Sequence, residues 1–295
     1  MSRDVPVSVV VMTKNEERDL PAALASASLF AEVFVVDSGS VDRTTAIAHE
    51  HGAIVVSFEW NGRYPKKKQW CLDNLPFSHD WVLYLDADEE VSPELGSELQ
   101  KLFSDGPDRS GYFVGLDYRF LGRVLRHGQR VYKLALLDRR HARFLDRDDL
   151  DAVNMWEVEG HYQPHVDGRV GVLTGRVLHD DHDSLFEYFA RHNRYSDWEA
   201  VRLRNGRFAS REEAQPPGRG TLKRVFAALP GKPILFFVYA YVLRGGFLDG
   251  RAGLHYAVAK SFYYWQVGVK ARQMAASSSP TRDDLHQLAA SDTQS

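Results

Sequence analysis

Two aspartates follow a strongly apolar segment late in the first hundred residues. Asp86 and Asp88 come directly after Trp81-Val-Leu-Tyr-Leu85, whose composition predicts a buried strand. Ligands of α/β sheets bind at the carboxyl ends of the strands, and two carboxylates placed there repel each other unless a cation offsets their charge. The spacing therefore predicts Mg²⁺ or Mn²⁺, held by carboxylates together with the phosphates of a substrate. As an alternative, these acids could simply crowd the start of a helix opened by Ser92-Pro93.

Polar residues also follow the first two predicted strands. Thr13, Asn15 and Glu16 come after the first β-branched run, and Asp37 comes after the second. A carboxylate in the position of Asp37 can accept hydrogen bonds from a base or a ribose. The same side chains can equally cap the helices that follow, which is their ordinary role in βα loops.

Strand-like and helix-like patterns alternate over the first hundred residues, which predicts a parallel sheet with right-handed crossovers. From Gly111 the apolar period changes to two, as expected for antiparallel strands added to that sheet. The predicted fold class is therefore α/β, with a mostly parallel nucleotide-binding sheet that is mixed in its C-terminal half, and an appended α-helical C-terminal region. Strands are predicted at 7–12, 33–36, 53–57, 81–85, 111–120 and 131–137, and helices at 16–30, 40–51, 66–74 and 184–204.

The composition is that of an ordinary globular protein. Of the 295 residues, 44% are hydrophobic and 26% charged, and the net charge of −3 gives no sign of nucleic-acid binding. The single cysteine, Cys71, excludes an internal disulfide and suits a reducing compartment. The first residues do not read as a signal peptide, and the apolar run 233–243 is about half the ~20 residues of a spanning helix. We therefore expect a cytoplasmic protein.

Changes in composition divide the chain into four parts. Residues 1–204 form one large domain, 205–220 a linker rich in Gly, Pro, Arg and Glu, 221–274 a helical region, and 275–295 a polar, disordered tail. The helical region mixes cations with aliphatic and aromatic residues. It can therefore lie at a membrane interface, or pack on the first domain or on another subunit, which leaves a homo-oligomer open.

Three spaced motifs resemble glycosyltransferase family 2, which is inverting and has a GT-A fold. They are Val-Val-Val-Met-Thr13-Lys-Asn15-Glu16, Val-Val-Asp37-Ser-Gly-Ser, and Leu-Asp86-Ala-Asp88-Glu. The similarity extends over residues 5–270 and includes Gly-Phe-Leu-Asp249-Gly. It is greatest to the branch that adds sugars to the lipopolysaccharide core or to similar cell-surface glycolipids.

The resemblance implies a role for each matching residue, with 1–204 as the GT-A catalytic domain. Asp88 would bind the metal, and His179, which matches the Leu-His of the branch, would complete the metal shell. The family pattern near Lys68 is close to Gln-Lys-Asn, whereas this chain has Lys67-Lys68-Gln69, so Lys66 and Lys67 remain alternatives to Lys68. The residues expected to hold the donor are Thr13, Asn15, Glu16, Asp37, Lys68 and Asp86.

An inverting transfer also needs a base that deprotonates the acceptor hydroxyl. The branch has His-Glu where this chain has Trp156-Glu157-Val-Glu159-Gly-His161. A strand here would place Glu157 and Glu159 on one face, so either can serve. We expect Glu159 to be the base, because an acceptor can approach the backbone at Gly160, and we retain Glu157 and His161 as alternatives. Both glutamates could also be ordinary surface carboxylates.

These inferences predict a metal-dependent, inverting glycosyltransferase. The donor would be a nucleotide-diphosphate sugar, with UDP as the favoured nucleotide, and the acceptor a cell-envelope glycan or glycolipid of the lipopolysaccharide type. The enzyme would lie peripherally at the inner face of the plasma membrane. One alternative is a non-catalytic module that binds sugar nucleotides or lipid. Another is a sugar-1-phosphate nucleotidyltransferase, which would require a Gly-rich loop where this chain has Thr13-Lys-Asn-Glu-Glu17.

Overall fold

The computed structural model describes residues 5–147, 149–150, 152, 154–159, 163–204 and 231–277. Several sequence predictions fall outside these residues. They are the linker at 205–220, the beginning of the C-terminal region at 221–230, the tail beyond 277, and the base candidate His161 with its neighbour Gly160.

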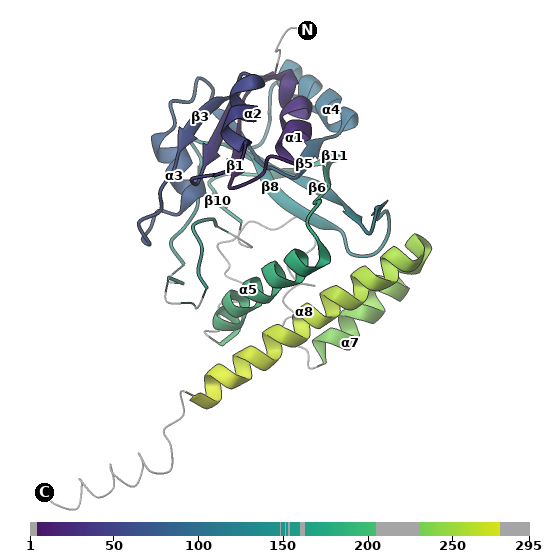
Figure 1. Cartoon of the computed structure of the whole chain (residues 1–295). Helices are drawn as coiled ribbons and strands as arrows, with labels where there is room; N and C mark the ends of the chain where they lie inside the picture. Colours follow the sequence, from purple (N-terminus) through teal and green to yellow (C-terminus); the bar gives the residue numbers. More distant parts are fainter. Residues whose placement is uncertain are drawn as a thin grey trace, which may run out of the picture.

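One mixed sheet forms the frame of the molecule (Figure 1). Its strands follow the order β3-β2-β1-β4-β8-β6-β11-β5, and β7 pairs with β6. The first four strands in this order are parallel, and β8 then pairs antiparallel with both β4 and β6. The predicted α/β class with a sheet that becomes mixed is thus confirmed. The strands of the sheet are β1 (Val5–Thr13), β2 (Phe30–Asp37), β3 (Ile54–Ser57), β4 (Trp81–Asp86), β5 (Glu89–Val91), β6 (Gly111–Phe120), β7 (Arg123–Val124), β8 (Val131–Asp138) and β11 (Val170–His179).

Helices cover both faces of the sheet, and each face has its own apolar core. One core packs residues of α1 (Leu20–Ser26), α2 (Thr44–Glu50) and α4 (Pro93–Asp105) against the sheet. The other contains Cys71 of α3 (Lys67–Asn74) and Trp198 of α5 (Leu185–Arg204). The remaining short elements are η1 (Ala27–Leu29) and the antiparallel pair of β9 (Ala142–Arg143) with β10 (His165–Val166).

The C-terminal helices lie below the sheet in Figure 1, where α5 runs beside α8 and α7 lies along α8. This region consists of α7 (Lys232–Phe237), the π-helical turn η2 (Val238–Leu243), the 3-10 turn η3 (Gly246–Asp249) and α8 (Gly250–Ser277). The tail was predicted to begin at residue 275, but α8 continues to Ser277. None of the described helices combines the length and the apolarity needed to cross a membrane.

Two local predictions were wrong. The first two helices begin at Leu20 and Thr44, four residues later than expected, because residues 16–19 and 40–43 form interlocked loops. The segment with Glu157 and Glu159 has no strand in its described residues, so the two glutamates do not share a strand face.

Candidate donor and metal site

The loops that follow β1 and β2 are tied together by hydrogen bonds. The backbone N–H of Asn15 donates to Ser40 Oγ at 2.7 Å, and Asn15 Oδ1 accepts the N–H of Val41 at 2.9 Å. Asn15 has a φ of 58°, in the left-handed region that asparagine tolerates better than most residues. β1 and β2 are parallel, and Thr13 pairs with Asp37 at their carboxyl ends. Both loops therefore leave the same edge of the sheet.

Asp37 lies at the centre of this network and is only 4% exposed. Its carboxylate accepts hydrogen bonds from Thr13 Oγ1 at 2.9 Å, Ser40 N at 2.8 Å and Ser40 Oγ at 2.5 Å. Burial opposes ionisation, but these donors outweigh it and lower the pKa of Asp37 below its ordinary value. Asp37 therefore holds a charged acceptor in a fixed orientation at the strand edge.

Two of the three consecutive lysines are buried and are paired within the protein. Lys66 Nζ lies 3.1 Å from Asp149 Oδ1, and both side chains are almost fully buried. Lys67 Nζ donates to Ser38 Oγ at 2.5 Å and lies 3.3 Å from Glu157 Oε1. Both lysines therefore join neighbouring segments of the protein rather than face a ligand.

Lys68 is the lysine that faces the acidic strand end. Burial lowers the pKa of Lys68, and the charge of Asp86 acts in the opposite direction. Its Nζ also lies 5.9 Å from the centre of the Phe144 ring. Among the three candidates, this geometry favours Lys68 as the donor contact.

Glu159 is used structurally at the start of α3. Its carboxylate accepts the backbone N–H groups of Lys68 at 2.6 Å and Gln69 at 2.9 Å, and the residue is 1% exposed. Since Lys66 provides no side-chain cap, Glu159 satisfies N–H groups that the first turn of a helix leaves unpaired. Burial raises the pKa of Glu159, although these N–H groups act in the opposite direction. Glu157 instead accepts a hydrogen bond from Ser38 Oγ.

The loop after β4 is held by a buried glutamate and a lysine. Glu89 Oε2 accepts the backbone N–H of Asp86 at 2.9 Å, which closes the turn from Asp86 to Glu89. Lys133 Nζ, from β8, lies 3.0 Å from Asp86 Oδ2 and 2.5 Å from Glu89 Oε2. Burial opposes ionisation of Asp86, but Lys133 and Lys68 hold its pKa well below the usual range. Asp86 is therefore charged and paired.

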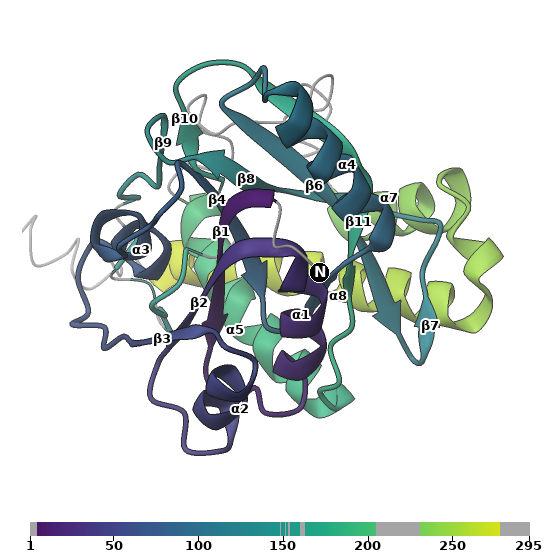
Figure 2. The same cartoon turned by 90° about the horizontal axis from the view of Figure 1, so that it is seen from above.

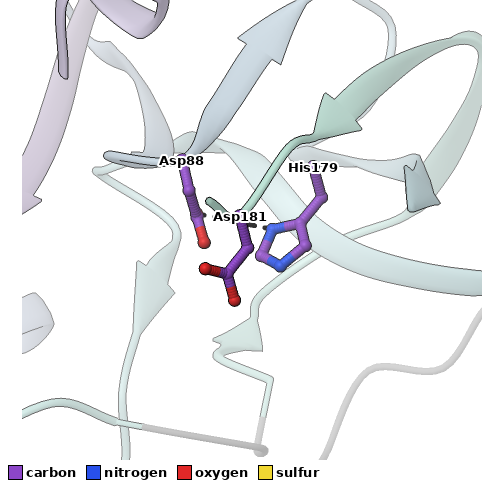
Figure 3. Close-up of side chains that lie close together, drawn as sticks. All are labelled: Asp88, His179 and Asp181. Atoms are coloured by element: carbon purple, nitrogen blue, oxygen red, sulfur yellow. Dashed lines mark ion pairs between the residues drawn. The ribbon is translucent and has the colours of Figure 1, made fainter. Parts of the chain in front are cut away.

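Asp88 has a different environment, shown in Figure 3. The side chains of Asp88, His179 and Asp181 converge so that one ligand atom from each lies within 4.8 Å of the others. His179 Nδ1 is 3.4 Å from Asp88 Oδ1 but lacks hydrogen-bond geometry, and it has no hydrogen-bond partner among the described residues. Burial and then nearby acids, Asp86 foremost, raise the pKa of Asp88 to about 7, although His179 opposes this shift.

These three residues fit a divalent cation. Carboxylate oxygens suit Mg²⁺ and Mn²⁺, and imidazole is a common ligand of transition ions. The orphaned imidazole nitrogen and the crowded carboxylates are both costly without a cation. Asp88 and His179 were predicted as metal residues, and the structure brings them together.

Aromatic rings and a neighbouring acid enclose this cluster. The ring of Tyr118 packs edge-on against His179 at 4.7 Å, and Tyr256 of α8 packs on Tyr118 at 5.9 Å. Glu16 was predicted to contact the nucleoside, but it is close enough to Asp88 for that charge to act on it. Burial first, and then Asp88, raise the pKa of Glu16 to about 8.

Sequence reasoning missed four residues of this site. Asp181 was not predicted as a metal ligand, because the pattern 179–183 offers several acids of equal standing. Arg191 of α5 forms ion pairs with Asp181 and Asp183, which orders this loop. No sequence pattern pointed to Lys133 or Glu89. Their ion pair forms because Lys133 lies on the antiparallel strand β8, which is distant from Glu89 in the sequence.

The sequence of this chain is similar to those of known glycosyltransferases. The model described as "Glycosyl transferase family 2" matches residues 8–156. An uncharacterized glycosyltransferase of Rickettsia conorii is 40% identical over 102 residues, which cover 33% of this chain and 34% of that relative. This chain thus matches about a third of the length of the relative.

Longer but weaker similarities extend beyond the matched domain. Lipopolysaccharide core biosynthesis glycosyltransferase LpsC of Rhizobium meliloti is 26% identical over 287 residues, which cover 95% of this chain and 97% of that protein. The crystal structure of glucosyl-3-phosphoglycerate synthase from Mycobacterium tuberculosis with Mn²⁺, uridine diphosphate and phosphoglyceric acid aligns with a TM-score of 0.39. That alignment has 23% identity over 65% of this chain and 76% of the other.

Proposed function

The chain belongs to glycosyl transferase family 2, and from this we propose that it transfers a sugar from a nucleotide-diphosphate donor to an acceptor hydroxyl, with inversion at the anomeric carbon. The observation that carries the proposal is the cluster of Asp88, His179 and Asp181 at the carboxyl-end edge of the sheet that also holds Asp37. A site for diphosphate and metal thus adjoins a site that can accept hydrogen bonds from a nucleoside.

The donor would lie along this edge. Its nucleoside would meet the loops of Thr13, Asn15 and Asp37, and its diphosphate would meet Lys68 near Asp86. A divalent ion held by Asp88, His179 and Asp181 would offset the negative charge that develops on the leaving diphosphate. Since Asp37 and Lys68 are already oriented by internal contacts, little ordering is needed when the donor binds.

The base of the reaction belongs to the segment around Glu157, and the contacts now favour Glu157 over Glu159. Both oxygens of Glu159 accept backbone N–H groups of α3, so protonation there would weaken a helix start. Glu157 is less buried, and its partners are the side chains of Ser38 and Lys67, which a bound donor can displace.

For the acceptor we propose a cell-envelope glycolipid of the lipopolysaccharide type. Support comes from the lipopolysaccharide core biosynthesis glycosyltransferase LpsC, whose similarity spans 95% of this chain. Exposed apolar residues of the C-terminal region, among them Leu243 at 73% and Leu248 at 54% exposure, suit an enzyme that meets its acceptor at a membrane. We place the enzyme peripherally at the inner face of the plasma membrane.

The proposal is tested by turnover of sugar nucleotides in the presence of Mn²⁺. We expect one UDP-sugar to give UDP release that depends on a rough-type lipopolysaccharide acceptor, and inverted anomeric configuration in the product by NMR. Binding of UDP without turnover of any sugar nucleotide would instead identify a non-catalytic module. Full turnover in EDTA would contradict the metal assignment.

The base assignment is tested by paired substitutions. Glu157→Gln should lower kcat by about 10²–10⁴-fold while the donor affinity stays unchanged, because a base acts only on the chemical step. Glu159→Gln should mainly lower the free energy of unfolding, by about 1–2 kcal/mol, through the weakened start of α3. If Glu159→Gln causes the larger loss of kcat at unchanged stability, Glu159 is the base, as the sequence first indicated.

A further inference from the structure

The tip of the β6–β8 hairpin and the turn η3 form one continuous surface at the end of α8. In Figures 1 and 2, β7 of this hairpin lies next to the α7–α8 end of the molecule. Hydrogen bonds join the two segments: Gly128 N–H donates to Arg244 O at 3.0 Å, Arg123 Nη2 to Leu248 O at 3.4 Å, and His127 N–H to Asp249 Oδ2 at 2.8 Å.

Asp249 fixes this junction. It is 2% exposed, and its carboxylate also accepts the backbone N–H of Arg126 at 3.2 Å and lies 3.1 Å from His127 Nδ1. Gly246 lets η3 lie close against η2, since a Cβ there would lie 2.7 Å from Ala240 O. The sequence indicated no role for the Gly-Phe-Leu-Asp249-Gly motif. In the structure, this motif holds the hairpin tip against the C-terminal helices through hydrogen bonds to Asp249.

The surface formed by the hairpin tip and η3 is cationic, although the whole chain has a net charge of −3. Residues 121–130 and 242–255 contain five arginines and one acid, Asp249, which is buried. Across the part of the chain that the structure describes, no carboxylate lies within ion-pair distance of Arg123, Arg126, Arg244 or Arg251, and all four are exposed. These arginines are therefore available to a partner.

Large apolar side chains are exposed among these arginines. Phe247 and Leu248 of η3 are 51% and 54% exposed, and Leu121 at the hairpin tip and Leu243 at the end of η2 are exposed as well. A nucleic acid would neutralise the arginines but leave these side chains in water. A membrane interface with anionic headgroups takes both, because apolar side chains enter the acyl boundary while arginines remain at headgroup depth.

We propose that this hairpin–η3 surface, formed by Leu121, Arg123, Arg126, Leu243, Arg244, Phe247, Leu248 and Arg251, docks on an anionic lipid bilayer. The proposal rests on the proposed function in one respect, namely that a glycolipid acceptor brings the enzyme to a membrane. It places the contact at the hairpin, the end of η2 and η3 rather than along α7.

Flotation of the full chain with vesicles tests the surface directly. Wild-type protein should float with phosphatidylcholine vesicles that contain 30% phosphatidylglycerol, and poorly with pure phosphatidylcholine. Each arginine near an anionic leaflet contributes about fivefold to the partition coefficient, so Arg123→Gln with Arg126→Gln should lower it about 25-fold. Phe247→Ser with Leu248→Ser should lower binding to a similar or larger extent.

Two matched controls locate the contact. Lys101→Gln with Arg169→Gln removes two exposed cations, from α4 and from the turn before β11, and should leave flotation unchanged. Ile234→Ser with Leu235→Ser removes two exposed apolar side chains of α7 and should have less than a threefold effect. If the α7 pair abolishes flotation and the hairpin and η3 pairs do not, the proposed surface is wrong.

Further outcomes separate this proposal from the proposed function. A thermal shift with UDP and Mn²⁺, measured without vesicles, should be the same in all variants, which shows that they fold. Absence of that shift in wild-type protein would count against the proposed function, while flotation would still be informative. Equal flotation with neutral and anionic vesicles would overturn the lipid proposal. So would a dimer in light scattering that Phe247→Ser dissociates while flotation persists.

Discussion

At one end of the strand edge, the Asp37 carboxylate accepts three hydrogen bonds from Thr13 and Ser40; at the other end, no hydrogen bond reaches the Asp88 carboxylate within the described residues. The donors lower the pKa of Asp37, whereas burial and nearby acids raise that of Asp88. The nucleoside end is therefore complete without a ligand, while the acidic end is unfavourable until a cation arrives. The Asp37 end therefore adds to the stability of the free protein, whereas the Asp88 end lowers it in exchange for a binding site.

The largest expected effect on activity comes from substitution of Asp88 at the acidic end. Asp88→Asn should abolish Mn²⁺ binding, measured by electron paramagnetic resonance, and lower kcat/KM by roughly 10³-fold. The same change should raise the Tm of the metal-free protein by about 2–4 °C, because it removes a charge that lacks a partner. A lower Tm in EDTA would show that Asp88 is stabilised by something other than a cation.

Substitutions of Lys66 and Lys68 should distinguish a role in stability from a role in donor binding, although the two residues are only two positions apart. Lys66→Met leaves Asp149 without its cation and should cost about 3–5 kcal/mol of unfolding free energy in a denaturant titration. Lys68→Met should leave stability nearly unchanged and reduce kcat/KM about 10–100-fold through the lost contact with the diphosphate. The reverse pattern would move the donor contact from Lys68 to Lys66.

Substitution of Asp37 should reduce activity less than substitution of Asp88, and should change the Tm in the opposite direction. Asp37→Asn replaces a charged acceptor and should lower the Tm by a few degrees, in contrast to Asp88→Asn. It should raise the donor KM about tenfold with little change in kcat, since contacts to the nucleoside are equal in the ground and transition states. A collapse of kcat at constant KM would place Asp37 in the chemical step.

The smallest expected effect is a difference in acid sensitivity. The folded pKa of Asp37 lies below its ordinary value of 3.8, so the folded state favours the ionised form. Its contribution is complete above that value and is lost as the pH falls through the lower, folded pKa. Acid unfolding below about pH 4 should therefore be less steep in Asp37→Asn than in wild-type protein, when followed by circular dichroism. Identical acid transitions would contradict this contribution.

Sequence patterns predicted the architecture well and the functions of single side chains less well. The alternation of β-branched runs and amphipathic segments depends on local order, so strands β1 to β4 were found where expected. The roles of Glu159 and Lys67 depend on contacts between segments about 90 residues apart, which no local pattern contains. Asp181 was undervalued for a similar reason, because only the path of β11 brings it to Asp88.

The stack of Tyr256 on Tyr118, and of Tyr118 on His179, has an evolutionary consequence. Phe120 and Leu125 of the hairpin share a buried cluster with Ala252 and Tyr256 of α8, so the rear wall of the metal cluster is formed by the C-terminal helix. A gene fusion or recombination event that joined residues 1–204 to a foreign C-terminus would leave His179 without this support. The C-terminal helices should therefore be inherited together with the hairpin, as one recombination unit rather than an exchangeable module.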